Sequence, residues 1–573
     1  MEINPKEAAQ YAREIEAILN GTTVPQEETV SVFYEAHPRD EQVEALIIFD
    51  DAPVAKRDGM SLVLGQSLGQ AEQSARQSIE RAQTSAMARI SRTLGYEVQA
   101  ETQLTLLTNA VSATVQYKDL AAIRQMPGIK RAILMPTYSM PEEEVALIQN
   151  AEMLKPYMKS AGPAMGANSA WDLGYKGEGM SVAVIDTGIS LINPAFEQQP
   201  QDQSRVAYTK EKIQGLLAGY NFHAKELVEG LTADQVYYSS KIPFAFNYAD
   251  GAADCHYDAH GSHVAGIVAG NVPEWAKEQF EMETMGIAPE AQLVGLKVFD
   301  AGGGARFSSI ARALEDAILL GVDCANLSLG SPCGPAYVEG MSEVFDAAYE
   351  AGISVAVSAG NSYFSGWGSL WGDNMVKSTS VDTGTVGMPG SFDAPLTVAS
   401  AENAAIFYTN GYALSYMTQY GYETYINYSE LAGVPEGKGF REQLGDREFE
   451  FTKDPADAEG KLLFSPVSED VDPVELVNQA MEAKAAGLIL VNGSQVTLTE
   501  FPLPIASLMA LYFNIMERDI QGNIRVEGFW NRSETAGQMS DFSSWGPTGS
   551  LTLKPEITGV GGNVLSAYGD GMG

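Results

Sequence analysis

Residues 180–188 read "MSVAVIDTG", and this stretch decides the fold. It is a short run of β-branched and small apolar residues that ends in Asp, Thr and Gly. Three runs of the same kind follow it, "AQLVGLKVFD" (291–300), "VDCANLSLG" (322–330) and "GISVAVSAGN" (352–361). Ala-rich helical segments separate these runs. Apolar strands that alternate with helices predict an α/β fold, a parallel sheet with helices on both faces.

The polar residues that close these strands indicate where chemistry would occur, because open parallel sheets bind ligands at the carboxyl ends of their strands. Asp186 closes the first strand. About seventy residues later, "HGSHVAGIVAG" (260–270) places a histidine at the start of a helix of small residues. Such a helix can lie close to its neighbours and hold an imidazole rigidly, as a general base requires. The sequence therefore favours His260 as a base that Asp186 orients.

The surrounding segment, "DCHYDAHGSH" (254–263), contains three of the five histidines of the chain and permits other interpretations. His, Asp and Cys are metal ligands, but no second His or Cys cluster accompanies them. His256 and Asp258 are better explained as solvated loop residues. We therefore assign no metal site and expect that no cofactor is required. Structural calcium stays open, since the acidic loops show no spaced ligand set.

Five segments of the chain resemble the signature segments of the subtilisin family (subtilases) of serine endopeptidases, and they occur in the same order as in that family. The resemblance extends from about Ala167 to the C-terminus. With the later "MSDFSSWGPT" (539–548) and the insert described below, the chain is similar to the lactocepin-like cell-envelope branch. The five segments are "VAVIDTGI" (182–189), "HGSHVAGIVAG" (260–270), "GIAPEAQLVGLKVFD" (286–300), "NLSLGS" (326–331) and "VSAGNS" (357–362).

The resemblance implies a role for individual residues. Asp186 would hold the imidazole of His260, and His260 would move the proton between the nucleophile and the leaving amine. The side-chain amide of Asn361 would stabilise the oxyanion. An extended peptide would pair along Ser328, Leu329 and Gly330. The family usually has Thr at the position of Ser262, a change that keeps the hydroxyl.

The nucleophilic serine of the family follows a "GTSMA"-like motif, and no such motif occurs in the 573 residues. We expect a sequence truncated before it, and hence a chain without proteolytic activity of its own. A competing candidate is Ser67 in "GQSLG" (65–69), which fits the nucleophile elbow of α/β-hydrolase esterases. That elbow needs a strand before it in the main sheet, whereas "GQSLG" opens a long helix.

The resemblance also implies a domain organisation. Strand, helix, paired strand, helix and strand predict a ferredoxin-like α+β unit, which resembles an inhibitory propeptide that is cleaved within 136–153. A later Tyr-rich, β-rich segment resembles a protease-associated domain. The expected parts are an N-terminal helix and linker (1–29), the propeptide (30–140), the first part of the catalytic domain (141–404), the protease-associated insert (405–532) and the truncated remainder of the catalytic domain (533–573).

Composition limits the partners. The formal net charge of −38 opposes binding to nucleic acid. No apolar run is long enough for a transmembrane segment, and no signal peptide is visible. Secretion or association with the cell envelope is therefore inferred from the resemblance, with protein or peptide substrates and the propeptide as an intramolecular inhibitor. The alternative class is a pseudoprotease or adhesion scaffold.

Overall fold

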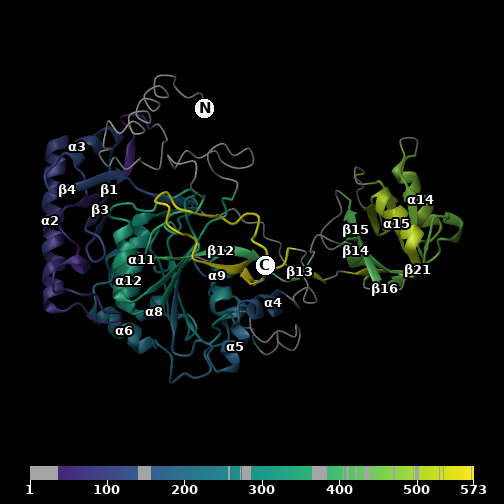
Figure 1. The fold of residues 1–573 in the computed structure, drawn as a ribbon, viewed down its shortest axis with the longest axis horizontal. Helices are drawn as coiled ribbons and strands as arrows, with labels where there is room; N and C mark the ends of the chain where they lie inside the picture. The colour runs from purple at the N-terminus through teal and green to yellow at the C-terminus, as the bar shows by residue number, and fades with distance from the viewer. Residues whose placement is uncertain are drawn as a thin grey trace.

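Three units make up the described part of this computed structural model, and Figure 1 shows them in chain order from purple to yellow. The expected helix at 1–29 and most of the expected cleavage region lie outside the described residues. The described residues are 37–139, 157–255, 259–271, 273, 286–363, 384–403, 405–407, 412–419, 423–431, 439–445, 447–468, 471–493, 496, 503–527, 530–532, 535–564, 566–568 and 571–572.

The central unit contains a sheet of seven parallel strands in the order β23-β12-β11-β10-β6-β8-β7. This sheet confirms the predicted α/β architecture. The strand order reverses at β6, which lies between β8 and β10, so the carboxyl end of β6 is a switch point of the kind that binds ligands. The strands are β6 (Ser181–Asp186), β7 (Phe244–Asn247), β8 (Gln292–Lys297), β10 (Cys324–Leu327), β11 (Ser354–Ser358), β12 (Leu396–Glu402) and β23 (Ile557–Gly562).

Both faces of this sheet are covered. Ala183 and Ile185 of β6 belong to one apolar cluster and Val184 to another, as alternation along a strand requires. Helices α11 and α12 contribute to the first cluster and α9 to the second. The helices of the unit are α4 (Tyr157–Ala164), α5 (Ala167–Asp172), α6 (Lys210–Gly219), α7 (His223–Leu227), α8 (Ala233–Val236), α9 (Ala259–Ala269), α11 (Phe307–Leu320) and α12 (Ser342–Ala351).

The N-terminal unit is an antiparallel sheet of order β2-β3-β1-β4 with two helices. One sheet face packs on α2 and α3. The other face joins the main apolar cluster of the central unit through Leu46 and Ile48, and Figure 1 shows the sheet between α2 and the helices α11 and α12. The elements are β1 (Gln42–Phe49), α2 (Gln70–Leu94), β2 (Thr102–Leu104), β3 (Ala110–Gln116), α3 (Leu120–Arg124) and β4 (Ile129–Leu134).

Beyond this sheet, short strand pairs connect parts of the chain. Strand β5 (Thr137–Ser139) pairs antiparallel with β9 (Gly304–Arg306) of the central unit. Strands β24 (Ala567–Tyr568) and β25 (Gly571–Met572) pair near the C-terminal end. Short 3-10 turns add to the units at Val54–Lys56, Tyr117–Asp119, Pro194–Phe196 and Pro455–Asp457.

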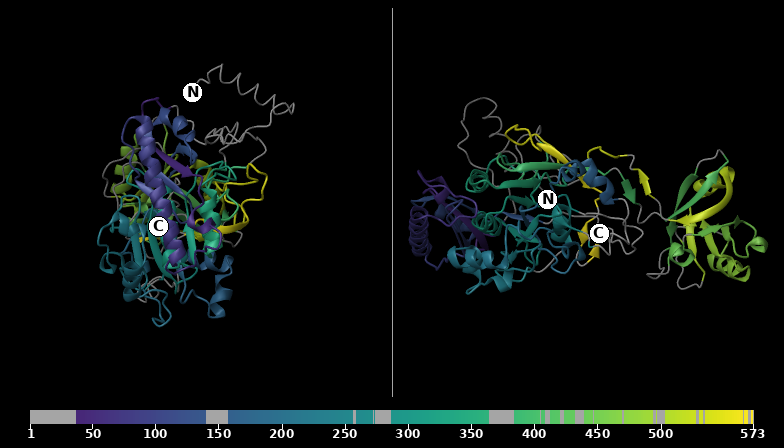
Figure 2. Two further views of the ribbon diagram at one scale, coloured as in Figure 1. Left: turned by 90° about the vertical axis from the view of Figure 1, so that its left-hand side faces the viewer. Right: turned by 90° about the horizontal axis from the view of Figure 1, so that it is seen from below.

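The third unit is an insert that leaves and re-enters the central unit through one antiparallel pair, β13 (Ala405–Phe407) with β22 (Trp530–Arg532). Figures 1 and 2 show its mixed sheet apart from the seven-stranded sheet. Two apolar clusters lie wholly within the insert. Its elements are β14 (Tyr412–Thr418), β15 (Glu423–Glu430), α13 (Phe440–Leu444), β16 (Arg447–Phe449), β17 (Phe451–Thr452), β18 (Leu462–Pro466), α14 (Pro473–Glu482), β19 (Gly487–Val491), β20 (Ile505–Leu508), α15 (Ala510–Asp519) and β21 (Ile520–Glu527).

Candidate active site

Asp186 and His260, which are separated by more than seventy residues in the sequence, are in direct contact in the structure. Asp186 ends β6 and is fully buried, and His260 lies in the first turn of α9 with 6% of its surface exposed. Nδ1 of His260 lies 2.6 Å from Oδ1 of Asp186. A carboxylate at Nδ1 selects the tautomer with the proton on that nitrogen, so Nε2 is left as the basic atom. This pair can therefore accept a proton from a nucleophile.

The loop after Asp186 is tied to the first turn of α9. Oγ1 of Thr187 accepts the Gly261 N–H at 2.9 Å, and Oγ of Ser262 accepts the Ser190 N–H at 2.8 Å. The hydroxyl at position 262 thus has a structural use. Gly261 is required by space, because a Cβ atom there would lie 2.1 Å from the carbonyl oxygen of Gly188. The small residues fix His260 against the strand end that carries its partner.

The far side of α9 contacts the stretch that follows β23. A Cβ atom on Gly266 would lie 2.2 Å from Oγ of Ser566, and that hydroxyl donates to the carbonyl of His263 at 2.7 Å. Nε2 of His263 lies 3.1 Å from the carbonyl oxygen of Val564. The predicted close packing of α9 is therefore present on two sides of the helix, and His263 belongs to that packing.

Lys297 is a site residue that sequence reasoning missed. It ends β8 in register with Asp186, is 6% exposed, and donates from Nζ to the carbonyl of Thr187 at 2.9 Å. The ammonium thus helps to hold the loop that follows Asp186. The signal was present in the sequence, since a lysine within the apolar run "AQLVGLKVFD" needs a polar partner once it is buried.

Asn361 and the segment Ser328–Gly330 lie at the same edge of the sheet as Asp186, because β10 and β11 are the parallel neighbours that follow β6. Asn361 is exposed just after β11. Its loop is held by Ser544, whose N–H donates to the Gly360 carbonyl at 2.8 Å and whose Oγ accepts the Ser362 N–H at 3.0 Å. The structure thus brings Asp186 and His260 together and places the other predicted residues along one edge.

The segment predicted to bind peptide, Ser328–Gly330, is attached to the rest of the central unit. Leu329 is 1% exposed and belongs to the main apolar cluster, whereas Ser328 and Gly330 are half-buried. Ser331, which follows, forms two backbone hydrogen bonds with Met388 at 2.9 and 3.0 Å. The buried side chain of Leu329 holds the segment in place. The backbone groups of Ser328 and Gly330 stay nearer the surface.

The metal interpretation of the histidine cluster gains no support. Within the parts of the chain that the structure describes, no group of three His, Cys, Asp or Glu side chains could hold a metal ion. His256 and Asp258 lie outside the described residues.

Ser67 does not lie in a nucleophile elbow. Helix α2 begins three residues later, at Gln70, but the preceding residues 57–69 form turns and loops, and the strand before them, β1, ends at Phe49. The elbow motif requires a strand that leads directly into the serine turn within the main sheet. The esterase interpretation therefore lacks its structural context.

The chain is similar in sequence to known proteins. A family model described as "Subtilase family" matches residues 177–572. A PII-type proteinase of Lacticaseibacillus paracasei is 30% identical over 492 residues, which cover 80% of this chain and 24% of the relative. The minor extracellular protease Vpr of Bacillus subtilis is 26% identical over 78% of this chain and 48% of its own.

Among solved structures, fervidolysin from Fervidobacterium pennivorans, a keratinolytic enzyme related to subtilisin, has a TM-score of 0.38 at 18% identity over 67% of this chain and 47% of its own. The chain spans about a quarter of the length of the PII-type proteinase that it matches. The family match extends over more than half of the 573 residues and includes Asp186, His260 and Asn361. The chain therefore belongs to the subtilase family of subtilisin-like serine peptidases.

Proposed function

We propose that this chain carries the acid–base part of a serine endopeptidase that hydrolyses peptide bonds in proteins. The observation that supports this most is the 2.6 Å contact between the buried Asp186 and His260 at the switch point of the sheet. Nε2 of His260 would take the proton of a serine hydroxyl as its oxygen bonds to the substrate carbonyl carbon. His260 would then give that proton to the leaving amine as the C–N bond breaks, and water would hydrolyse the acyl-enzyme.

Asp186 would stabilise the imidazolium that forms in both steps. Asn361 would donate its side-chain N–H to the developing oxyanion. Because the 573 residues contain no "GTSMA"-like motif, we propose that this chain alone does not hydrolyse peptide bonds.

Substrates would bind as extended strands. Support comes from β5, which lies antiparallel to β9 with Tyr138 opposite Ala305, so the central unit accepts a strand of the N-terminal unit. Tyr138 is fully buried. We propose that residues 37–139 act as an inhibitory prosegment whose tail occupies substrate-binding positions. In the isolated prosegment, Tyr138→Ala should then weaken inhibition of a longer product that contains the serine. Inhibition of unchanged strength would contradict this role.

We further propose that the 405–532 insert restricts which proteins reach the site, as a protease-associated domain would, and that the protein acts outside the cell or on its envelope. The extracellular relative Vpr supports this location. In the described residues, no helix combines the length and the apolar character needed to cross a membrane.

The test uses two proteins. The purified 573-residue chain should show no turnover of casein. If the gene continues past Gly573 into a Gly-Thr-Ser segment, the longer product should cleave casein, and His260→Ala should abolish the cleavage while the protein stays folded. A longer product that contains the serine, folds and remains inactive after removal of the prosegment would instead favour the pseudoprotease or adhesion scaffold.

A further inference from the structure

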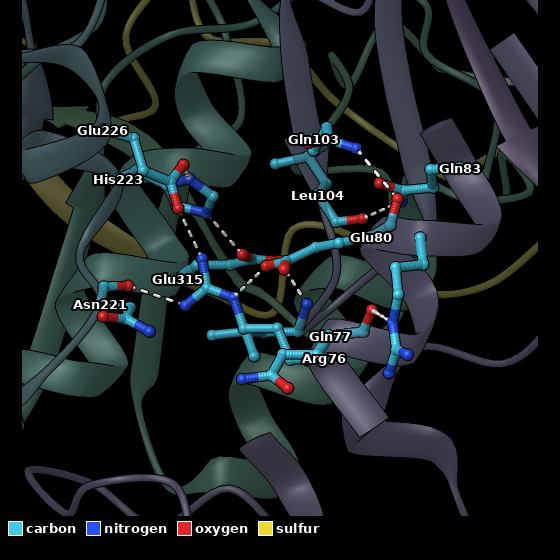
Figure 3. A network of polar contacts seen from close by, with 12 residues as sticks. Arg76, Gln77, Glu80, Gln83, Gln103, Leu104, Asn221, His223, Glu226 and Glu315 are labelled. Carbon is cyan, nitrogen blue, oxygen red and sulfur yellow. Dashed lines mark hydrogen bonds and ion pairs between the residues drawn. The ribbon is translucent and has the colours of Figure 1, made fainter. Parts of the chain in front are cut away.

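A buried histidine outside the candidate active site has two carboxylate partners. His223, the first residue of α7, is 1% exposed. Its Nδ1 lies 2.9 Å from Oε2 of Glu226, and its Nε2 lies 2.7 Å from Oε2 of Glu315 (Figure 3). A neutral imidazole has one N–H and one lone pair, so one nitrogen would face a carboxylate without a proton. Only the imidazolium satisfies both contacts.

The electrostatics agree with this geometry. Burial lowers the pKa of His223, but the hydrogen bonds and charges of Glu226 and Glu315 outweigh it and raise that pKa to about 10. The same contact lowers the pKa of Glu226 against the effect of its own burial. His223 is thus a cation at neutral pH.

Glu315 connects His223 to the N-terminal unit. This carboxylate belongs to α11 and is completely buried. Its second oxygen, Oε1, accepts the backbone N–H groups of Leu106 and Leu107 at 3.0 and 2.9 Å. These two residues lie between β2 and β3 of the N-terminal unit, so a carboxylate of the central unit satisfies two consecutive buried N–H groups of another unit.

Glu226 makes a second connection. Its Oε1 accepts from Nη2 of Arg76 in α2 at 2.7 Å, and the guanidinium also donates from Nη1 to the carbonyl of Asn221 at 2.8 Å. Arg76 is 4% exposed and pairs through Nε with Glu80 of its own helix at 3.0 Å. Figure 3 shows the resulting row of groups from Arg76 through Glu226 and His223 to Glu315.

We propose that the His223 imidazolium is the central cation of a charge lock that keeps residues 37–139 docked on the central unit. In this proposal, His223, Glu226 and Glu315 form a recognition surface for a partner that offers one arginine and two consecutive backbone N–H groups. The partner is the chain's own N-terminal unit, before and after the connection between the units is cut. Any role of this contact in regulating an enzyme rests on the proposed function of the N-terminal unit as a prosegment. The docking itself does not depend on that proposal.

Two other charged groups lie near His223, but among the described residues neither donates a hydrogen bond to Glu226 or Glu315. Asp316 of α11 accepts the backbone N–H groups of His223 and Ala224 at 2.8 and 3.0 Å and the hydroxyl of Tyr248 at 2.8 Å, so it adds negative charge. Arg312, one turn before Asp316, is the additional cation of α11, and its Nη2 donates to the carbonyl of Glu101. Without the charge of His223, two carboxylates would lose the hydrogen-bond donor between them.

The docking of residues 37–139 should therefore persist in mild acid and weaken in alkali. Since the pKa of His223 is raised in the docked protein, the contribution of its proton is complete below the ordinary value of 6.5 and is lost as the pH rises through about 10. Acidification to about pH 5 would not release the N-terminal unit by titrating His223, because this histidine is already protonated at neutral pH.

The test uses the full chain with a specific protease site inserted between residues 140 and 156. After cleavage, the release of the N-terminal fragment is followed by size-exclusion chromatography and by exchange with a labelled fragment. His223→Gln and Arg76→Met should each accelerate release about 10- to 100-fold, the range for losing a hydrogen bond to a charged group. Release from the unchanged protein should accelerate as the pH rises from 6.5 to about 10 and level off above it, and release from His223→Gln should not show this rise.

Controls make the result specific. Lys56→Gln removes an exposed ion pair of the same interface, Lys56 with Glu350 at 3.0 Å, and should change release by less than about threefold. The double variant of Arg76 and His223 should be less than multiplicative, because both residues act through Glu226. If His223→Gln folds poorly, Arg76→Met leaves the central unit unchanged and carries the test alone. Release equal to that of the unchanged protein in both single variants would overturn the proposal.

Discussion

Replacing Gly261 with alanine should break the contact between His260 and Asp186 without removing either side chain. The new Cβ atom would lie 2.1 Å from the carbonyl oxygen of Gly188 and 3.1 Å from Oδ1 of Asp186. Carbon and oxygen atoms that are not bonded to each other need about 3.3 Å, so the helix start must move by about 1 Å. The 2.6 Å hydrogen bond would then lengthen to about 3.6 Å, which is outside the range of a hydrogen bond.

The cost in stability follows from two opposing effects. Overpacking of this kind costs about 1–3 kcal/mol, whereas alanine in place of glycine inside a helix contributes about 1 kcal/mol in the opposite direction. We expect a net loss of about 0–2 kcal/mol in urea unfolding of the central unit. The contact itself is followed by proton NMR, where the hydrogen-bonded Nδ1 proton of His260 should give a low-field signal that disappears in the variant.

Gly215→Ala is the matched control. Gly215 lies inside α6 and is exposed, and a Cβ atom added to it would meet nothing within 4 Å. Alanine there should stabilise the protein by about 0.5–1 kcal/mol and leave the low-field signal intact. If Gly261→Ala behaved like Gly215→Ala in both measurements, close packing would not be what positions His260.

Further outcomes are expected elsewhere. The free energy of unfolding should fall by up to about 1.4 kcal/mol per pH unit between pH 6.5 and about 10, because the folded protein retains the His223 proton that the unfolded chain loses, and His223→Gln should remove most of this slope in urea titrations. In a longer product that contains the serine, Asn361→Leu should lower kcat about 10²–10³-fold with little change in KM; an unchanged kcat would refute its oxyanion role. Joining Phe407 to Trp530, which are paired in β13 and β22, by a short Gly-containing turn should leave thermal unfolding of the central unit nearly unchanged, and aggregation of that product would contradict the independence of the insert.

The sheet and the Asp186–His260 pair could be predicted because both depend on local patterns. A buried β-branched run that ends in Asp and a helix of small residues that begins with His each show in about ten residues of sequence. Their contact is confirmed at 2.6 Å. The roles of Asn361 and of Ser328–Gly330 stay predictions, although they lie at the expected edge of the sheet.

Contacts between units could not be predicted from local patterns. The run "QLTLLTNAVSATVQY" (103–117) predicts one strand, but the structure has β2 and β3 with residues 105–109 between them. The N–H groups of Leu106 and Leu107 are bonded to Glu315, about two hundred residues away, instead of a neighbouring strand. His223 likewise appears in the sequence as an isolated histidine, because its two carboxylates and Arg76 come together only when the units pack.

The single strand pair at the base of the insert affects how the central sheet can be completed. Strand β23 pairs with β12, and without the insert's own fold this pairing would close a loop of roughly 150 residues. Once the insert has folded around its own cores and β13 has met β22, the loop that remains is roughly 30 residues long, which lowers the entropic cost of closure by about 1.5 kcal/mol. Early folding of the insert would thus speed the pairing of β23 with β12, although none of the insert's described strands belongs to that sheet.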